Sequence, residues 1–363
     1  MRILAIECEL TTLLGGSERS YFDVLTGLQA KGHQVTLLYN RPGNLLDGYM
    51  KAGVNAIQSD HTLLLRNKLK DLRNMYSTAK RIGKLGTFDI VYINFAEALP
   101  LSFLIRLVNR IPVVCHLRIP YFGLSRQILW AGRVASAFIV INKKLQPVFE
   151  NVFKAKGKVS VIYNGLTIPT QLPPGRKVSS RQALKILYLG RIAPDKGVAE
   201  LVGALSKAAS KGVKASLQIT GAYLASHSGD YKVELKQAID ASGIGDIITI
   251  SPPVTDPIGY MSQFDLFVFP SIWDEPFGRT IGESILAGTP VLARNVGMVG
   301  EIMVDNPQFI FDTDEALADK IEQYFNGKLV FDVDAARSRI VRDFNKTRMI
   351  DEVESKLMGV IQK

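Results

Sequence analysis

Residues 264–293 read FDLFVFPSIWDEPFGRTIGESILAGTPVLA, and this stretch decides the fold. The apolar run 264–269 predicts a buried strand, and residues 287–293 predict a helix end followed by another strand. Between them, Glu275 and Glu283 lie on either side of a predicted helix start. In such units a ligand binds beyond the carboxyl end of the strand, where helix N-terminal amides face an anion. The stretch therefore predicts a site for a ligand that carries phosphate and hydroxyl groups.

The alternation of short apolar strands with amphipathic helices continues from one end of the chain to the other. This pattern is typical of parallel sheets that helices cover on both faces. We therefore expect an α/β protein with two doubly wound domains and a cleft between them. The predicted strands lie near residues 1–6, 34–39, 89–94, 112–115, 137–141, 158–163, 185–190, 215–220, 246–251, 264–269 and 290–294.

Domain boundaries are expected where proline accumulates. Residues 167–176, with the sequence TIPTQLPPGR, are typical of a linker. The tail from about Ala335 to Gln362 predicts two helices with a break near Asn345, and the second helix is expected to pack back on the first domain. The predicted parts are a first domain at 1–168, a linker at 169–184, a second domain at 185–345 and the returning helix at 346–363.

Length and composition restrict the class of protein. The chain has 363 residues, of which 47% are hydrophobic, and this is enough to build two cores. Cys8 and Cys115 are far apart and lack the spacing of a metal site, so we expect them to be reduced core residues. Residues 1–6 predict a short strand rather than a signal peptide, and no apolar run approaches the roughly 20 residues that span a bilayer. These patterns predict a cytoplasmic protein.

The net charge of +10 is concentrated in the first half of the chain. Residues 1–170 hold 22 Lys and Arg against 10 Asp and Glu, a balance of +12, whereas the remainder has a balance of −2. Within residues 63–84 the basic side chains are interspersed with leucines, which suits a helix that lies on an anionic membrane surface. A solvated helix that only aids solubility fits this run equally well. Nucleic acid is not an expected partner, because no recognition motif accompanies the charge.

Two glycine-containing loops could hold phosphate. Gly15 and Gly16 precede a helix predicted to end near Ala30, and paired glycines allow a phosphate to approach the helix N-terminus. A tight loop without a ligand explains these glycines as well. At the start of the second domain, Gly190 is followed by Arg191 and Lys196, which would place two cations over one site, as a leaving diphosphate requires. The alternative is two surface cations in a loop.

Three further features have both a functional and a structural explanation. His116 follows a predicted strand on the side where open sheets bind ligands, where it could contact a substrate hydroxyl or serve only in packing. The acidic triplets Asp312-Thr313-Asp314 and Asp332-Val333-Asp334 are similar to metal-binding triplets. Each precedes a helical pattern, so helix capping explains them better and no metal site is predicted.

Taken together and in this order, the motifs resemble those of the retaining glycosyltransferases of family 4, the group 1 glycosyltransferases. The resemblance covers nearly the whole chain and implies the GT-B fold, in which two Rossmann-like domains face each other across a cleft. It rests on Gly15-Gly16-Ser17-Glu18-Arg19, on Val161-Ile162-Tyr163-Asn164-Gly165, on Gly190-Arg191 with Lys196-Gly197, and on Glu275 and Glu283 with seven residues between them.

The resemblance implies a role for each matching residue on the donor side. Arg191 and Lys196 would hold the diphosphate of a nucleotide sugar and neutralise its charge in place of a metal ion. Glu283 would bind the ribose hydroxyls, and Glu275 would bind hydroxyls of the transferred sugar. The remaining residues of this expected donor pocket are Gly190, Phe277, Gly278 and Arg279.

The first domain would complete the site. Gly15 and Gly16 would approach the phosphates, and His116 would lie near the reacting face of the sugar. Three segments depart from the family pattern: Gly221-Ala222-Tyr223-Leu224, Pro252-Pro253-Val254, and Asn94 at a position often held by histidine. The first two lie near the expected base, so the donor is predicted as a UDP- or GDP-sugar without a choice between them.

The resemblance implies a metal-independent, retaining hexosyltransferase with no cofactor. It would act on a lipid-linked or saccharide acceptor in bacterial surface polysaccharide or glycolipid synthesis, as a peripheral protein on the inner face of the plasma membrane. A nucleotide-sugar epimerase of the same fold and a non-catalytic nucleotide- or glycan-binding subunit are the alternatives. An oxidoreductase is disfavoured, because the dinucleotide glycine fingerprint is missing after the first strand of either domain.

Overall fold

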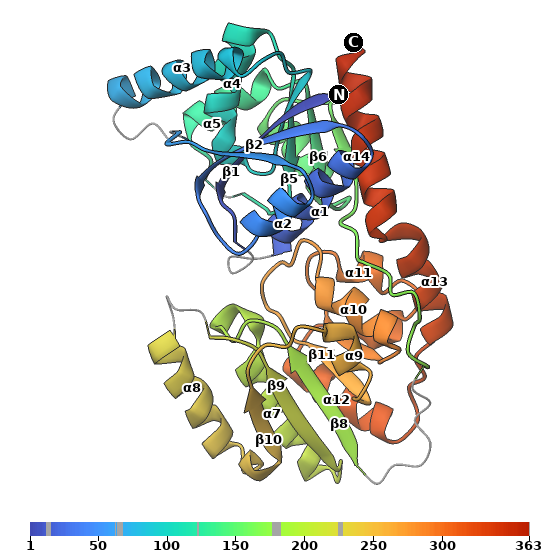
Figure 1. Cartoon of the computed structure of the whole chain (residues 1–363). Coiled ribbons are helices and arrows are strands. Elements are labelled where there is room, and N and C mark those ends of the chain that lie inside the picture. The colour runs from blue at the N-terminus through green and yellow to red at the C-terminus, as the bar shows by residue number, and fades with distance from the viewer. Residues whose placement is uncertain are drawn as a thin grey trace. The chain divides into compact units, whose positions relative to one another are not determined.

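The computed structural model describes residues 1–11, 16–61, 63, 68–121, 123–175, 183–223 and 228–362. The chain forms two compact units, which are described separately below. Unit 1 comprises Met1–Gly165 together with Asn345–Lys363, and unit 2 comprises Leu166–Phe344. Figure 1 shows a sheet with helices on its faces in each unit, so the predicted α/β class is confirmed.

Unit 1 is built on a seven-stranded sheet with the order β3-β2-β1-β4-β5-β6-β7, and every described strand pair in it is parallel. Because β1 lies between β2 and β4, the strand order reverses beside it, and the carboxyl ends of β1 and β4 flank a topological switch point. The strands are β1 (Arg2–Glu9), β2 (Gln34–Arg41), β3 (Asn55–Gln58), β4 (Ile90–Ile93), β5 (Val113–Leu117), β6 (Ala137–Val140) and β7 (Val159–Val161).

The helices of unit 1 bury apolar stripes against this sheet. The last helix, α14, packs on α1, and a Cβ placed on Gly27 would lie 2.4 Å from Cδ1 of Ile350, so glycine permits this close approach. Val353 and Leu357 of α14 belong to the same buried cluster as the strands. The helices are α1 (Gly16–Ala30), α2 (Leu46–Lys51), α3 (Lys68–Lys84), α4 (Leu99–Asn109), α5 (Arg126–Arg133), α6 (Leu145–Val152) and α14 (Lys346–Ile361), with a 3₁₀ turn η1 (Ala96–Ala98).

Unit 2 has a six-stranded parallel sheet with the order β10-β9-β8-β11-β12-β13. Its order reverses between β8 and β11, which creates a second switch point. The strands are β8 (Leu184–Leu189), β9 (Ala215–Thr220), β10 (Ile248–Ser251), β11 (Leu266–Phe269), β12 (Val291–Arg294) and β13 (Ile310–Phe311). The helices are α7 (Val198–Ser210), α8 (Ser228–Ala241), α9 (Pro257–Met261), α10 (Arg279–Ala287), α11 (Val299–Ile302), α12 (Asp314–Phe325) and α13 (Val333–Asp343), with 3₁₀ turns η2 (Pro194–Lys196), η3 (Gly245–Ile247) and η4 (Pro307–Phe309).

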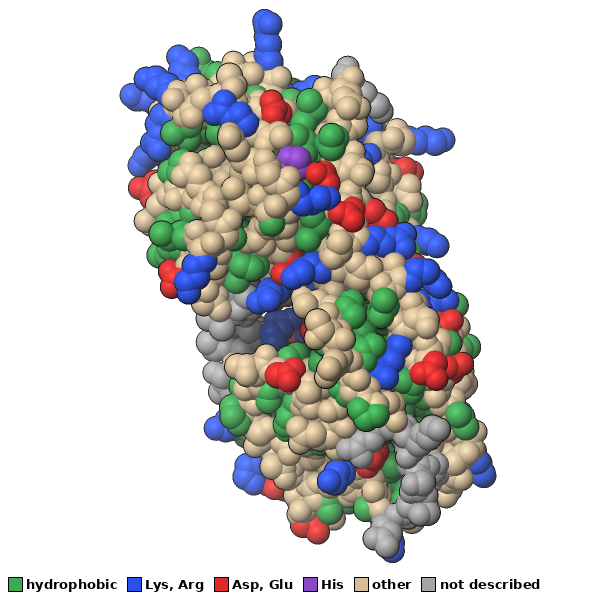
Figure 2. Space-filling model, turned by 45° about the vertical axis from the view of Figure 1, so that its right-hand side comes forward, with side chains coloured by type: hydrophobic (Ala, Val, Ile, Leu, Met, Phe, Trp, Pro, Cys, Tyr) green, Lys and Arg blue, Asp and Glu red, His purple; other side chains and the backbone are tan. Residues whose placement is uncertain are grey.

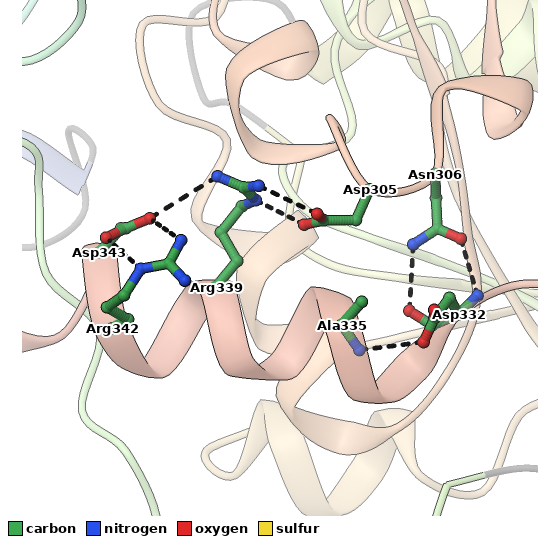
Figure 3. A network of polar contacts seen from close by, with 7 residues as sticks. All are labelled: Asp305, Asn306, Asp332, Ala335, Arg339, Arg342 and Asp343. Carbon is green, nitrogen blue, oxygen red and sulfur yellow. Dashed lines mark hydrogen bonds and ion pairs between the residues drawn. The ribbon is translucent and has the colours of Figure 1, made fainter.

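The acidic triplets are explained by capping, as the sequence predicts. The Asp332 side chain accepts a hydrogen bond from the amide of Ala335 at 2.9 Å and begins α13, and Asn306 fixes the backbone of Asp332 through two hydrogen bonds (Figure 3). Further along α13, Arg339 makes a two-point ion pair with Asp305 (Figure 3), which lowers the pKa of that carboxyl. In the first triplet the cap of α12 is Thr313 rather than an aspartate.

Some local predictions are wrong. The strands β3 and β13 were not anticipated, because β3 lacks an apolar run and β13 has only two residues. The first strand continues past residue 6 to Glu9, since Glu7 is buried and stays in register with Tyr39. Cys8 is exposed rather than a core residue, because alternate side chains of a strand point to opposite faces and the neighbouring Glu7 points inward. Cys115 is buried, as predicted.

Candidate active site

The candidate site in unit 2 lies at the switch point, where three loops meet at the carboxyl ends of β8, β11 and β12. The loop after β8 begins with Gly190, whose amide donates to the carbonyl of Thr220 at 3.1 Å and keeps the ends of β8 and β9 together. A Cβ on Gly221 would lie 1.8 Å from the Gly190 carbonyl oxygen. Glycine at position 221 is therefore required for the two strand ends to approach this closely.

The turn that carries Lys196 is held between β8 and β11. Residues Pro194–Lys196 form the 3₁₀ turn η2, and Gly197 follows with a φ of +68°. A Cβ there would lie 2.1 Å from the carbonyl oxygen of Pro270, at the end of β11. The turn thus lies directly against the neighbouring strand, which brings Lys196 to the loop that carries Glu275.

That neighbouring loop is fastened to the turn by its backbone. The carbonyl of Asp195 accepts hydrogen bonds from the amides of Ile272 and Trp273 at 3.1 and 3.2 Å. On the other side, the carbonyl of Glu275 accepts from the amide of Met298 at 3.2 Å, in the loop after β12. Backbone hydrogen bonds alone therefore fix the position of Glu275 between two loops.

Four charged side chains form a cluster on these loops. The ammonium group of Lys196 donates to Oε1 of Glu275 and lies 3.4 Å from Oδ2 of Asp195. The same Asp195 oxygen lies 4.0 Å from the guanidinium of Arg191. Asp195 therefore bridges the two predicted cations, and the cluster holds two positive and two negative charges. The Lys196 side chain is almost buried, so its charge is only weakly screened by solvent.

The helix α10 supplies the remaining predicted donor residues. Gly278 precedes it with a φ of +69°, a left-handed conformation that glycine adopts without strain. Phe277 is buried, and its ring lies 6.0 Å from that of Phe344, so it serves in packing beneath the loop. One turn into the helix, Oε1 of Glu283 lies 3.9 Å from Nε of Arg279.

The buried residue Tyr188, which the sequence analysis missed, holds the backbone of the Arg191 loop in place. The hydroxyl of Tyr188 donates to the carbonyl of Arg191. Burial raises the pKa of Tyr188 well above its usual range, so it remains a neutral donor. Tyr188 points inward from β8 and fixes the backbone from which Arg191 projects.

Unit 1 has its own pocket of about 230 Å³ at its switch point, beyond the ends of β1, β4 and β5. Glu7 at the end of β1, Asn94 after β4 and Arg118 after β5 are all buried at this position. Nε of Arg118 donates to Oδ1 of Asn94 at 2.6 Å, and another nitrogen of the same guanidinium donates to Asn164. The remaining lining residues are Cys8, Glu9, Ser17, Glu18, Phe95, Glu97, Ile119 and Tyr121.

His116 lies behind this pocket and is fully buried. Its Nδ1 is 2.7 Å from the hydroxyl of Tyr92 and 3.2 Å from a guanidinium nitrogen of Arg118. Burial, and then the charge of Arg118, hold the pKa of His116 well below its usual range, so the imidazole is neutral. The structure thus joins His116 to Arg118, a residue that no sequence motif indicated.

The carboxyl group of Glu7 is protonated at neutral pH. Burial raises its pKa from 4.5 to about 8, against the opposing effect of a hydrogen bond from the amide of Cys8 at 2.8 Å. The negative charge of Glu18 raises this pKa further, and a hydrogen bond that the carboxyl accepts from the side chain of Asn94 lowers it. A neutral carboxylic acid can donate a hydrogen bond as well as accept one, which widens what this pocket can bind.

The predicted site residues fall into three groups. Arg191, Lys196 and Glu275 share one cluster in unit 2. Gly190, Phe277 and Gly278 lie on the adjoining loops, and Arg279 and Glu283 lie in α10. Gly16 is the first residue of α1 in unit 1, and His116 lies in β5. Gly15 lies outside the described residues, as do Leu224 and the linker residues 176–182.

Comparisons of the sequence agree with the resemblance. The family Glycosyltransferase Family 4 matches residues 14–168, and Glycosyl transferases group 1 matches residues 176–340. A D-inositol 3-phosphate glycosyltransferase of Arthrobacter sp. is 36% identical over 122 residues, which are 33% of this chain and 28% of that protein. The capsular polysaccharide glycosyltransferase CapM of Staphylococcus aureus is 28% identical over 178 residues, 46% of this chain and 44% of that protein. The chain thus spans less than half the length of these two relatives.

Solved structures share the fold of the whole chain. A structure of Anabaena HepE in complex with UDP and glucose has a TM-score of 0.80 at 20% identity and covers 99% of this chain and 100% of that chain. A glycosyltransferase from Rickettsia africae has a TM-score of 0.82 at 21% identity, with 100% and 99% covered. With both halves matched by family and both sheets wound as in these neighbours, the chain belongs to the group 1, family 4 glycosyltransferases of the GT-B fold.

Proposed function

We propose that this protein transfers a hexose from a nucleotide diphosphate sugar to a lipid-linked or saccharide acceptor, with retention of anomeric configuration and without a metal ion. The observation that carries this proposal is the cluster of Arg191, Asp195, Lys196 and Glu275 at the switch point of unit 2. Relatives named for capsular polysaccharide and lipopolysaccharide synthesis support a product at the bacterial surface, and the UDP in HepE supports a nucleotide sugar.

In this proposal the two cations replace a metal ion. As the sugar leaves, negative charge accumulates on the diphosphate, and preorganised positive groups stabilise that charge most strongly where water is scarce. Lys196 is suited to this task because it is almost buried and is already held by Glu275 and Asp195. Arg191 is more exposed, and its guanidinium can reach an arriving phosphate by turning away from Asp195.

The sugar and the ribose would be bound by different carboxylates. Glu275 lies on the loop beside Lys196, so a sugar attached to the diphosphate would meet Glu275 first. Glu283 projects from α10 one turn further and would accept hydrogen bonds from the ribose hydroxyls. Gly190 and Gly278 would allow the backbone to approach the phosphates, and the loop from Phe277 to Arg279 would line the pocket.

The acceptor would bind in the pocket of unit 1. Its lining combines the neutral acid Glu7, the carboxylate of Glu18 and the buried guanidinium of Arg118, and such groups suit a hydroxyl-rich molecule. Gly16, at the start of α1, would let a phosphate group approach the N-terminus of that helix. His116 would act on the acceptor through Arg118 and Tyr92 rather than by direct contact, since its ring is buried.

Two substitutions test whether Glu283 binds the ribose and Glu275 binds the transferred sugar. Glu283→Ala should weaken donor binding about tenfold or more, because ribose hydroxyls lose an ionised acceptor. Glu275→Ala should instead lower turnover or change sugar choice, because it removes a sugar contact and the partner of Lys196. The measurements are donor affinity by calorimetry and transfer rate by mass spectrometry, after a thermal-shift screen of UDP- and GDP-sugars has identified the donor.

The same assay separates the alternative functions. An epimerase would convert the donor into an isomeric nucleotide sugar without an acceptor, and a non-catalytic subunit would bind nucleotide without releasing sugar. If Glu283→Ala and Glu275→Ala both leave binding and turnover unchanged, the proposed donor site is wrong. Glu301→Ala is the matched control, because this carboxylate lies on α11 of the same unit and has no assigned role.

We also propose that α3 places the protein on an anionic membrane surface, at the inner face of the plasma membrane. Met75, Ala79 and Ile82 are buried, whereas the opposite side exposes Leu69 by 83% of its surface. The other exposed side chains of this helix include Lys70, Leu72, Arg73 and Tyr76. The described residues do not include Leu64, Leu65 and Arg66. Among the described residues, no helix is long and apolar enough to span a bilayer.

Vesicle sedimentation tests the α3 surface. Lys70→Glu with Arg73→Glu should lower binding to anionic vesicles about thirtyfold at low salt, since each basic residue near such a surface contributes about 1 kcal/mol. The same change in neutral vesicles should have no effect. If the variant sediments as the original protein does, the charge on α3 only aids solubility.

A further inference from the structure

A second cavity of unit 1 shares no lining residue with the pocket that Glu7, Asn94 and Arg118 line. It is a groove of about 1240 Å³ in unit 1, at the amino ends of β5 and β6, whereas the acceptor pocket lies beyond carboxyl ends of the same sheet. The end of α4 and the end of α14 form its walls. Its lining residues are Phe103, Arg106, Leu107, Arg110, Pro112, Val134, Ser136, Ala137, Gly157, Lys158, Ser355, Lys356, Gly359, Val360 and Ile361.

The charge of this groove is of one sign. Four basic side chains line it and no carboxylate does: Arg106, Arg110, Lys158 and Lys356. Within the described part of the chain, no ion pair to an acidic group involves Arg106, Arg110 or Lys158. Arg110 and Lys158 are exposed. The groove therefore has unneutralised positive charge that an anionic ligand would complement.

One wall of the groove is apolar, and its exposure to water is unfavourable. Leu107 exposes 66% of its surface and Val134 exposes 36%. Trp130 lies beside the groove rather than in its lining: it exposes 56% of its surface, and its ring packs edge-on against the lining residue Phe103 at 4.7 Å between ring centres. Large apolar side chains exposed beside unpaired cations suit a ligand that is both anionic and apolar. An inorganic anion or a sugar phosphate would leave this wall in water.

Helix α4 lies between the groove and α3. Helix α3 packs on α4, and α4 packs on α5, which carries Trp130. The side-chain amide of Asn109, at the end of α4, donates to the carbonyl of Ala79 in α3 at 2.9 Å. On the face that Figure 2 shows, Lys and Arg side chains of unit 1 lie among hydrophobic ones. The α3 surface and the groove thus lie on neighbouring helices of unit 1.

We propose that this groove binds an anionic phospholipid of the membrane, with the phosphate between Arg110 and Lys158 and an acyl chain along Leu107, Val134 and Trp130. The inference goes beyond glycosyl transfer, which does not depend on it. It differs from the α3 proposal in naming a bounded site for one lipid molecule rather than a charged surface. Trp130 and Trp273 are the two tryptophans of the chain, so a Trp273→Phe background leaves Trp130 as the reporter.

The test uses the full chain in that background with phosphatidylcholine vesicles that contain or lack phosphatidylglycerol. We expect Trp130 fluorescence to be quenched by phosphatidylglycerol with brominated acyl chains. Arg110→Asp with Lys158→Glu should lower vesicle binding about thirtyfold, by the same contribution per basic residue. The backbone of Arg110 is left-handed, with a φ of 59°. Aspartate is chosen as its replacement because aspartate tolerates this conformation.

Matched controls distinguish the site from general charge. Lys214→Glu with Lys232→Glu makes the same charge change at exposed positions of unit 2 and should leave binding unchanged. Lys70→Glu with Arg73→Glu should weaken sedimentation while Trp130 remains quenched by the lipid still bound. The proposal is overturned if Arg110→Asp with Lys158→Glu binds as the background protein does, if Trp130 is not quenched, or if soluble glycerol phosphate binds as tightly as the vesicles.

Discussion

Replacement of both Arg191 and Lys196 by alanine is expected to reduce the rate of sugar transfer by a factor on the order of 10² or more, by analogy with the loss of one preorganised donor. The two side chains supply the positive charge of the unit 2 cluster, and Asp195 holds them within 4.0 Å of a shared carboxylate oxygen. Without them, Asp195 and Glu275 would face the diphosphate with like charge. The loss should appear in kcat rather than in KM alone, because negative charge grows as the sugar leaves.

The single variants separate catalysis from folding. Arg191→Ala removes an exposed side chain and should leave the melting temperature nearly unchanged while activity falls. Lys196→Ala also removes the partner of Glu275, so a lower melting temperature is expected for this variant. Lys207→Ala with Lys211→Ala removes two cations from exposed ion pairs at the end of α7 and is the control, with activity retained. Near-normal transfer by the Arg191 and Lys196 double variant would refute the assignment.

Replacement of Glu7 by glutamine is expected to stabilise the protein at alkaline pH and to have little effect near pH 4.5. The folded-state pKa of about 8 lies above the ordinary value of 4.5. Between these values the unfolded chain releases a proton that the folded chain keeps, so the stability of the original protein falls as pH rises from 4.5 to 8 and then levels off. Glutamine keeps the acceptor for the Cys8 amide and does not titrate, so its advantage should reach a few kcal/mol.

In a Trp273→Phe background, unfolding followed by Trp130 fluorescence measures this effect in unit 1. Free energies of unfolding in urea would be compared for Glu7→Gln and the original protein, at about pH 5 and about pH 8.5, the ends of the window in which Glu7 titrates. Glu9→Gln, at a more exposed carboxylate of the same strand end, should show no comparable dependence. Parallel curves for Glu7→Gln and the original protein would mean that Glu7 is ionised in the folded state.

The sequence predicted the repeating elements well because they depend on local periodicity. The strands β8 and β9 lie within a residue of their expected ranges, and the break near Asn345 is the cap between α13 and α14. The edge strand β3 was missed because its half-exposed residues lack an apolar run. A strand of that kind forms because its neighbour β2 offers unpaired backbone groups, and this is not visible in its own residues.

In the candidate site too, the sequence predicted the residues but not their contacts. Arg191, Lys196 and Glu275 were predicted from motif order, but the motif did not show that Lys196 bonds to Glu275 or that Asp195 lies between the cations. Arg118 has no motif, and only the neighbouring position of β4 and β5 brings it to Asn94. The one signal in the sequence is the place of Arg118 directly after the strand Val113–Leu117, at the end of the sheet where open sheets bind ligands.

By itself, the sequence determined the α/β class, the parallel winding and the residue types at the strand ends, because hydrophobic periodicity and glycine act over a few residues. Only the tertiary structure decided which of these residues meet. Residues 195 and 275 are far apart in the chain, and they come together because β8 and β11 are neighbours in the sheet. The raised pKa of Glu7 is also a consequence of the tertiary structure, because several segments of the chain together bury its carboxyl group.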